Sequence, residues 1–257
     1  MSFALITGAS KGIGRAIAKE LASRKFNVLL VARSEDLLSH LANEIKSTYG
    51  VDCSYLVCDL TKETAPQEIF NWCSSQNYTV SILVNNAGYG LSGSFETRAI
   101  QEHMEMLNVS ALATIRLIHL FLPQLKQQKK SFILNIGSSA AYQAVPYLAT
   151  YAAAKSFIVN FSRALKFELK KTSVSVTVVS PGVTDTEFPL RANVNEKGLK
   201  TAEKISMTPA AVAKIAVDSM FKGKTEVLTG FLTKATVFFV KLLPKKFSER
   251  TGAKFYQ

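Results

Sequence analysis

The chain has 257 residues, of which 47% are hydrophobic and 19% charged, a balance typical of a packed globular protein and not of a disordered one. Its formal net charge of +12 suits nucleic acid, an anionic membrane or an anionic ligand as a partner. The three cysteines, Cys53, Cys58 and Cys73, are odd in number and lack paired spacing. This argues against a disulfide framework and favours a reducing compartment, so we expect a cytoplasmic protein.

The start of the chain shows no secretory signal, because no positively charged lead and apolar core precede the first apolar run at residues 3–7. No uncharged apolar run approaches the roughly 20 residues that cross a bilayer. His40, His103 and His119 lie far apart and form no ligand pattern with the cysteines, so we predict no metal site.

Short apolar runs then alternate with helical patterns along the chain, and most of the runs are rich in Val, Ile and Leu without polar alternation. Such runs are typical of strands buried on both faces. The predicted strands are residues 3–7, 27–32, 51–58, 80–84, 131–136, 174–179 and 226–229, and the clearest amphipathic stretches are residues 14–24, 35–49 and 151–171. Strands separated by helices predict a mostly parallel, doubly wound α/β sheet of seven strands in one domain.

Between the first strand and the first helix lies a glycine-rich turn, Thr7–Gly14. Glycines let backbone amides approach a ligand closely, and the helix that starts near Gly12 directs its free N–H groups to the same place. We therefore predict a dinucleotide phosphate site, with a plain tight turn as the alternative.

The second predicted strand ends with Val31-Ala32-Arg33-Ser34, where a NAD-selective site would offer an acid to the ribose. Arg33 instead offers a planar cation suited to a 2′-phosphate, and Lys11 adds a second positive charge. NADP is therefore favoured over NAD, unless Arg33 is an ordinary solvated charge.

Further along, Tyr151 and Lys155 are four residues apart in Tyr-Ala-Ala-Ala-Lys. On a helix this spacing puts both side chains on one face, about one turn apart. An ammonium beside a phenol favours the phenolate, so we expect the pKa of Tyr151 to fall from about 10 toward neutrality. A phenol tuned in this way can exchange a proton with an alcohol or carbonyl oxygen.

Taken together, these motifs resemble the short-chain dehydrogenase/reductase family from Phe3 to about Thr229. Thr7–Gly14 matches the family's T-G-x-x-x-G-x-G turn, and residues 85–88 match its N-N-A-G motif. The resemblance implies a Rossmann-type fold and assigns the cofactor to Gly8, Ser10, Lys11, Gly12, Ile13, Gly14, Arg33, Asp59, Leu60, Asn86, Ala87, Gly88, Tyr151, Lys155, Pro181, Gly182, Val183, Thr184 and Thr186.

The same resemblance implies four catalytic residues, Asn108, Ser138, Tyr151 and Lys155. Ser138 lies thirteen residues before Tyr151, where the family has its serine, and Ser139 is the alternative. Tyr151 would donate a proton to a carbonyl oxygen that Ser138 also binds, Lys155 would hold the nicotinamide ribose, and Asn108 would position a relay water. For Asn108 a mere helix irregularity is the alternative.

The expected substrate pocket includes Ser138, Tyr142, Tyr147 and Phe188. Its apolar residues favour an apolar or lipid-like ketone or alcohol, although they are equally compatible with packing. We expect residues 1–230 to form the catalytic domain and residues 231–257 a basic, apolar helical extension. The extension is predicted to pack on the domain or a partner subunit, to contact a membrane peripherally, or to have no role.

The leading hypothesis is an NADP-dependent carbonyl reductase or alcohol dehydrogenase, and the alternatives are a 3-oxoacyl-ACP/CoA reductase and a non-catalytic NADP(H) sensor. The resemblance also implies a homodimer or homotetramer. No nucleic-acid role is expected, because the basic residues are dispersed without an aromatic stripe.

Overall fold

The computed structural model describes residues 2–185 and 206–253, and within them seven strands form a single sheet in the order β3-β2-β1-β4-β5-β6-β7. Every strand pair is parallel, which confirms the predicted doubly wound α/β fold. The strands are β1 (Ser2–Thr7), β2 (Asn27–Ala32), β3 (Cys53–Val57), β4 (Thr79–Asn85), β5 (Ser131–Ile136), β6 (Val174–Ser180) and β7 (Glu226–Leu228).

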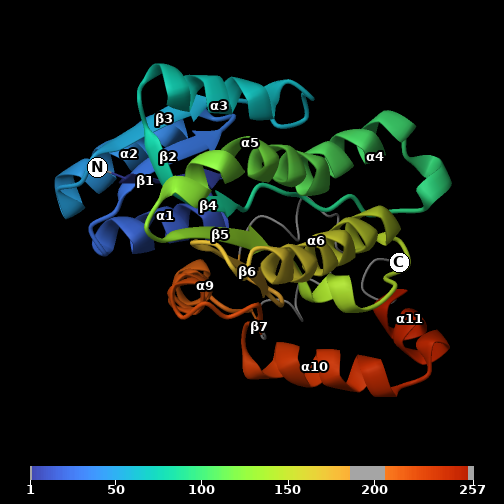
Figure 1. The fold of residues 1–257 in the computed structure, drawn as a ribbon. Helices are drawn as coiled ribbons and strands as arrows, with labels where there is room; N and C mark the ends of the chain where they lie inside the picture. Colours follow the sequence, from blue (N-terminus) through green and yellow to red (C-terminus); the bar gives the residue numbers. More distant parts are fainter. Residues whose placement is uncertain (1, 186–205, 254–257) are drawn as a thin grey trace.

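Helices follow the strands along the chain and cover both faces of the sheet (Figure 1). They are α1 (Gly12–Ser23), α2 (Glu35–Tyr49), α3 (Ala65–Ser75), α4 (Ile100–Leu107), α5 (Ala113–Gln127), α6 (Ala149–Glu168), α9 (Pro209–Phe221), α10 (Phe231–Leu242) and α11 (Lys245–Ala253). Three short turns complete the described elements, namely η1 (Phe95–Thr97), the π-helical η2 (Asn108–Leu112) and η3 (Ser139–Tyr142).

The core has two layers because alternate strand residues face opposite sides of the sheet. On β1, Ala4 and Ile6 pack toward α1, α2 and α9, whereas Phe3 and Leu5 pack toward α3, α5 and α6. Phe121 of α5 is the largest fully buried side chain and lies in the second layer. Burial on both faces explains why the strands read as continuous apolar runs.

This topology brings the predicted motifs to one edge of the sheet. β1, β4, β5 and β6 are neighbours, and each ends immediately before a segment that carries a motif. Buried amides hold that edge together, since Asn85 Nδ2 donates to Asn135 Oδ1 at 2.9 Å and Asn135 Nδ2 donates to Ser162 Oγ at 2.8 Å. Ligands of open parallel sheets bind at this carboxyl edge, where the strand order reverses.

One helical stretch, Ile100–Gln127, is long and apolar enough by length and composition to cross a membrane. It comprises α4, η2 and α5, and 44% of its most apolar window is buried inside the domain. Packing of α5 against α3 and the sheet accounts for this apolar character.

The C-terminal segment forms two further helices on the carboxyl side of β7. In Figure 1, α10 runs along the outer margin of the molecule and α11 turns back toward the η3 region. Val237 of α10 is buried, and α11 approaches the loop before α6, where Gly252 lies near Val145 and Pro146. The extension therefore packs on its own domain.

Candidate functional site

A cavity of about 810 Å³ lies at the carboxyl edge of the sheet. This volume is within the range of roughly 300–1,000 Å³ that is typical of small-molecule sites. The predicted site residues that line it are Gly8, Ser10, Lys11, Gly12, Ile13, Arg33, Asp59, Leu60, Asn86, Ala87, Gly88, Ser138, Tyr142, Tyr151, Lys155, Pro181, Gly182, Val183 and Thr184.

The glycine turn between β1 and α1 is packed so tightly that side chains are excluded from it. Gly8 has a φ of +65°, and a Cβ there would lie 2.8 Å from Asn86 Nδ2. A Cβ on Gly14 would lie 2.2 Å from the Gly8 carbonyl oxygen. Asn86 Nδ2 donates to that same oxygen at 3.2 Å, so the turn and the residues after β4 brace each other. Gly14 therefore supports the turn from behind and does not itself line the cavity.

The end of the cavity near β2 is positively charged. Lys11 is the N-cap residue of α1, whose N-terminus opens toward the cavity, and Arg33 follows β2. Arg33 is exposed, and within the described residues it forms no ion pair. Asp59 after β3 accepts a hydrogen bond from the Thr61 amide at 3.1 Å. Cations and a helix N-terminus together suit a phosphate group.

Tyr151 and Lys155 lie one turn apart on the buried face of α6, at the other end of the cavity. Their residues are only 6% and 4% exposed. Lys155 Nζ lies 5.8 Å from the centre of the Tyr151 ring and donates to the Ile136 carbonyl at 2.9 Å. The amine therefore faces inward, where its charge acts on the phenol across a poorly hydrated space.

Burial also changes the amine itself. Removal from water lowers the pKa of Lys155 from its ordinary 10.5 to about 8. Gly88 makes room for the amine, because a Cβ there would lie 3.2 Å from Lys155 Nζ and 3.4 Å from Ser110 Oγ. The lysine is thus still mostly protonated at pH 7, although its charge is lost far more easily than that of a surface lysine.

Ser138 caps the η3 turn that follows β5. Its Oγ accepts a hydrogen bond from the Ala140 amide at 3.1 Å, which leaves the hydroxyl proton available to donate into the cavity. The Ser139 amide donates to the Pro181 carbonyl at 2.8 Å, which ties η3 to the segment after β6. Both serines line the cavity.

Asn108 does not line the cavity but lies at the π-helical turn between α4 and α5. Its Nδ2 donates to the Thr61 carbonyl at 3.2 Å, while its Oδ1 is buried and has no hydrogen-bond partner among the described residues. The hydroxyl of Ser110 in the same turn is also buried, and the part of the chain that the structure describes offers it no hydrogen-bond partner. Such orphaned acceptors are suited to an ordered water. The helix irregularity that we considered as an alternative is therefore real, and it coexists with a polar environment suited to a relay.

Tyr142 lines the cavity, but its hydroxyl is bonded elsewhere. It donates to Glu226 Oε1 at 2.8 Å, and Ser180 Oγ lies 3.2 Å away. Burial and the Glu226 carboxylate raise the pKa of Tyr142 well above its ordinary value. Tyr142 is therefore a poor proton donor.

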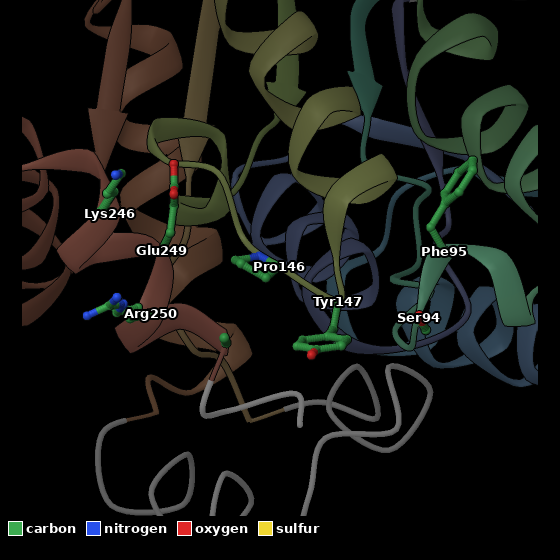
Figure 2. A pocket seen from close by; sticks show the side chains of 8 residues that line it. Ser94, Phe95, Pro146, Tyr147, Lys246, Glu249 and Arg250 are labelled. Carbon is green, nitrogen blue, oxygen red and sulfur yellow. The ribbon is translucent and has the colours of Figure 1, made fainter.

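Besides Gly14 and Asn108, three predicted residues are not part of the described cavity. Tyr147 lines a separate, smaller hollow together with Phe95 and the α11 residues Lys246 and Arg250 (Figure 2). It has a φ of +64°, and the loop turns there before α6 begins. Thr186 and Phe188 lie outside the described residues.

The C-terminal helices form a wall of the cavity that the sequence did not assign residue by residue. The lining residues from this wall are Leu232, Thr233, Thr236, Val237, Phe239, Val240, Leu243, Phe247, Ser248, Thr251 and Gly252. A Cβ on Gly182 would lie 2.1 Å from Thr233 Oγ1, so α10 packs directly on the segment after β6. The apolar spacing of residues 231–243 was the available signal, but it does not specify which face points inward.

The fold and this arrangement of side chains define a class of protein, and comparison with known families agrees. Residues 2–197 match the family model described as short chain dehydrogenase. The chain therefore belongs to the short-chain dehydrogenase/reductase family.

Two relatives and one solved structure show how much of the chain resembles known proteins. A very-long-chain 3-oxoacyl-CoA reductase of Laccaria bicolor is 36% identical over 179 residues, which cover 68% of this chain and 52% of the relative. The inactive hydroxysteroid dehydrogenase-like protein 1 of Homo sapiens is 29% identical over 248 residues, which cover 95% of this chain and 72% of the relative. A short-chain dehydrogenase from Sphingobium yanoikuyae, solved in complex with NADPH, has a TM-score of 0.82 at 25% identity, covering 95% of this chain and 97% of that chain. The chain thus spans between half and three quarters of the length of these two curated relatives.

Proposed function

We propose that this protein is an NADP-dependent oxidoreductase that transfers hydride between NADPH and a ketone or secondary alcohol. One observation carries the proposal: Ser138, Tyr151 and Lys155 line the same cavity as the glycine turn and Arg33. A proton-transfer group at one end and a phosphate-binding end at the other match a dinucleotide beside a carbonyl substrate.

The residues present fit such a cofactor. The turn that excludes side chains at Gly8 and Gly14 leaves amides free to approach a pyrophosphate, with the α1 N-terminus behind them. Asp59, which the family resemblance assigns to the adenine, and residues 181–184, which it assigns to the nicotinamide end, both line the cavity. The 2′-phosphate of NADP would lie against Arg33 and Lys11, which favours NADP over NAD. The structure with NADPH from Sphingobium yanoikuyae supports a nicotinamide cofactor.

Each of the four proposed catalytic side chains has a distinct task. Bound NADPH supplies the hydride. Tyr151 donates a proton to the substrate oxygen, and Ser138 donates a hydrogen bond to the same oxygen as negative charge develops there. The charged Lys155 favours the phenolate left on Tyr151, and Asn108 Oδ1 holds a water that returns the proton from solvent.

The cavity wall indicates an apolar substrate. Val145 and Leu148 line it from the loop before α6, and Val237, Phe239 and Val240 line it from α10. Burial of a hydrocarbon-rich ketone against this apolar surface is favourable, whereas burial of a small charged acid there costs free energy.

A 3-oxoacyl thioester carried by coenzyme A or an acyl carrier protein is the second candidate substrate. Two observations favour it: the similarity to a very-long-chain 3-oxoacyl-CoA reductase, and the hollow that Lys246, Glu249 and Arg250 of α11 line on one side and Tyr147 on another (Figure 2). Those cations suit the phosphates of coenzyme A outside the cavity, while an acyl chain lies within it.

The test is a screen of purified protein with NADPH against steroid, aromatic and 3-oxoacyl-CoA ketones. Turnover is measured as the loss of NADPH absorbance. Turnover of at least one ketone that Tyr151→Phe abolishes is expected. If the Lys246→Glu/Arg250→Glu variant raises the KM of an acyl-CoA and not that of a free ketone, the second candidate is favoured. NADPH binding without turnover of any ketone would instead support a sensor, and one relative is itself named inactive.

We further propose that the protein is a homodimer or homotetramer built through α4–α6. On these helices Ile100, Met104, Phe157 and Phe167 are 67%, 45%, 44% and 68% exposed, and they offer apolar surface for a second copy. Light scattering after gel filtration tests this proposal, and a monomeric mass would reject it.

A further inference from the structure

Helix α10 carries an apolar stripe that points away from the domain. Phe231, Phe238 and Leu242 are 83%, 60% and 66% exposed. Their spacings of seven and eleven residues correspond to two and three helical turns, so the three side chains lie in one narrow row. None of them lines the cavity, and α10 runs along the outer margin of the molecule in Figure 1. The cavity therefore does not account for this stripe.

The opposite side of α10 fixes its orientation. Val237 is buried, Thr233 packs on Gly182, and Lys241 Nζ lies 5.5 Å from the centre of the Tyr142 ring. Rotating the helix to bury Phe231 and Phe238 would expose Val237 and break the contact at Gly182. The outward stripe is thus a property of the packed helix.

The charges around the stripe indicate what covers it. Lys234 and Lys241 each follow a stripe phenylalanine by three residues, Lys245 and Lys246 come next, and Glu249 is the sole acid in residues 231–253. Apolar side chains flanked by lysines are typical of helices that lie in a membrane interface, where ammonium groups reach lipid phosphates. A second copy docked on the same face about a two-fold axis would bring like charges together.

We propose that α10 is a docking surface for an anionic lipid membrane, with Phe231, Phe238 and Leu242 entering the acyl boundary and the exposed Lys234 and Lys245 binding headgroup phosphates. Leu232, Phe239 and Leu243 line the cavity and are also 58%, 57% and 40% exposed, so the cavity reaches the surface along the same helix. If the proposed function holds, an apolar substrate dissolved in lipid enters there.

The experiment is co-flotation of the full-length protein with phosphatidylcholine vesicles that contain or lack phosphatidylglycerol, in the absence of substrate so that it does not depend on turnover. Wild-type protein floats with the anionic vesicles, and high salt weakens the association. The variant Phe231→Ser/Phe238→Ser/Leu242→Ser reduces vesicle binding about tenfold or more. The variant Lys234→Glu/Lys245→Glu does the same on anionic vesicles.

Matched control variants distinguish vesicle binding through this surface from nonspecific vesicle binding. Lys129→Glu/Lys130→Glu removes the same net charge at exposed positions before β5, and Val57→Ser removes an exposed apolar side chain at the β3 edge of the sheet. Both controls are expected to float like wild type, and unfolding temperature confirms that all variants are folded. The proposal is overturned if wild type stays with the soluble fraction, if the controls lose binding equally, or if the α10 variants change only the molecular mass in solution.

Discussion

The buried amine of Lys155 gives a prediction that needs no knowledge of the substrate. In the folded protein its pKa is lowered to about 8 by burial, whereas the ordinary value in an unfolded chain is 10.5. Below pH 8 the amine is charged in both states, and the folded state bears the full cost of keeping that charge out of water. Between pH 8 and 10.5 the unfolded state binds more protons, so stability rises with pH.

The difference between those two pKa values corresponds to about 3 kcal/mol. Replacing Lys155 with methionine keeps the length of the side chain and removes the charge. Lys155→Met is therefore expected to be more stable than wild type near pH 7 by up to about 3 kcal/mol, and this advantage shrinks as pH rises through 8 to 10.

Urea unfolding of both proteins between pH 6.5 and roughly 10 measures this difference directly. Lys129→Met at an exposed position is the control, and its difference from wild type should stay flat over the same range. A pH-independent difference for Lys155→Met, or one that grows in the alkaline range, would refute the burial of a charged amine in the cavity.

Two further predictions concern the cofactor. Arg33→Ala is expected to raise the KM for NADPH by about tenfold or more and that for NADH little, because a charge-assisted hydrogen bond to phosphate is lost; equal effects on both cofactors would exclude a phosphate contact. Gly14→Ala places a Cβ 2.2 Å from the Gly8 carbonyl oxygen and so should destabilise the protein by about 2 kcal/mol or more and weaken NADPH binding, measured by thermal unfolding and by cofactor fluorescence. Gly252→Ala meets only ordinary contacts and should do neither; a stable Gly14→Ala variant with normal affinity would contradict the packed turn.

The sequence predicts the sheet well because buried parallel strands carry a continuous apolar signal. Residues 27–32 and 131–136 have the predicted bounds of β2 and β5. The predicted strand 51–58 is shorter, at Cys53–Val57, because β3 is an edge strand with hydrogen bonds to β2 alone. Ends of strands depend on a neighbour, and a sequence pattern does not contain that neighbour.

The sequence identifies some of the site residues but not the contacts of others. The glycine turn, Tyr151 and Lys155 follow from spacing, because local backbone geometry places them. Tyr142 and Tyr147 look alike in the sequence, yet one hydroxyl bonds Glu226 across the sheet edge and the other residue lines a different hollow. The contact of Thr233 with Gly182 joins residues about fifty positions apart, so no local sequence pattern reveals that α10 forms a wall of the cavity.

We propose above that Tyr151, beside the buried amine of Lys155, transfers the proton that accompanies hydride transfer. The most direct test of this proposal is the turnover of Tyr151→Phe with NADPH and the best ketone from the screen, together with the Kd for NADPH. Tyr78→Phe is the control, since the hydroxyl of Tyr78 bonds Ser54 and the residue does not line the cavity. For Tyr151→Phe alone we expect kcat to fall about a hundredfold or more while the Kd for NADPH stays unchanged. A Tyr151→Phe variant that turns over within a fewfold of wild type would contradict the proposal.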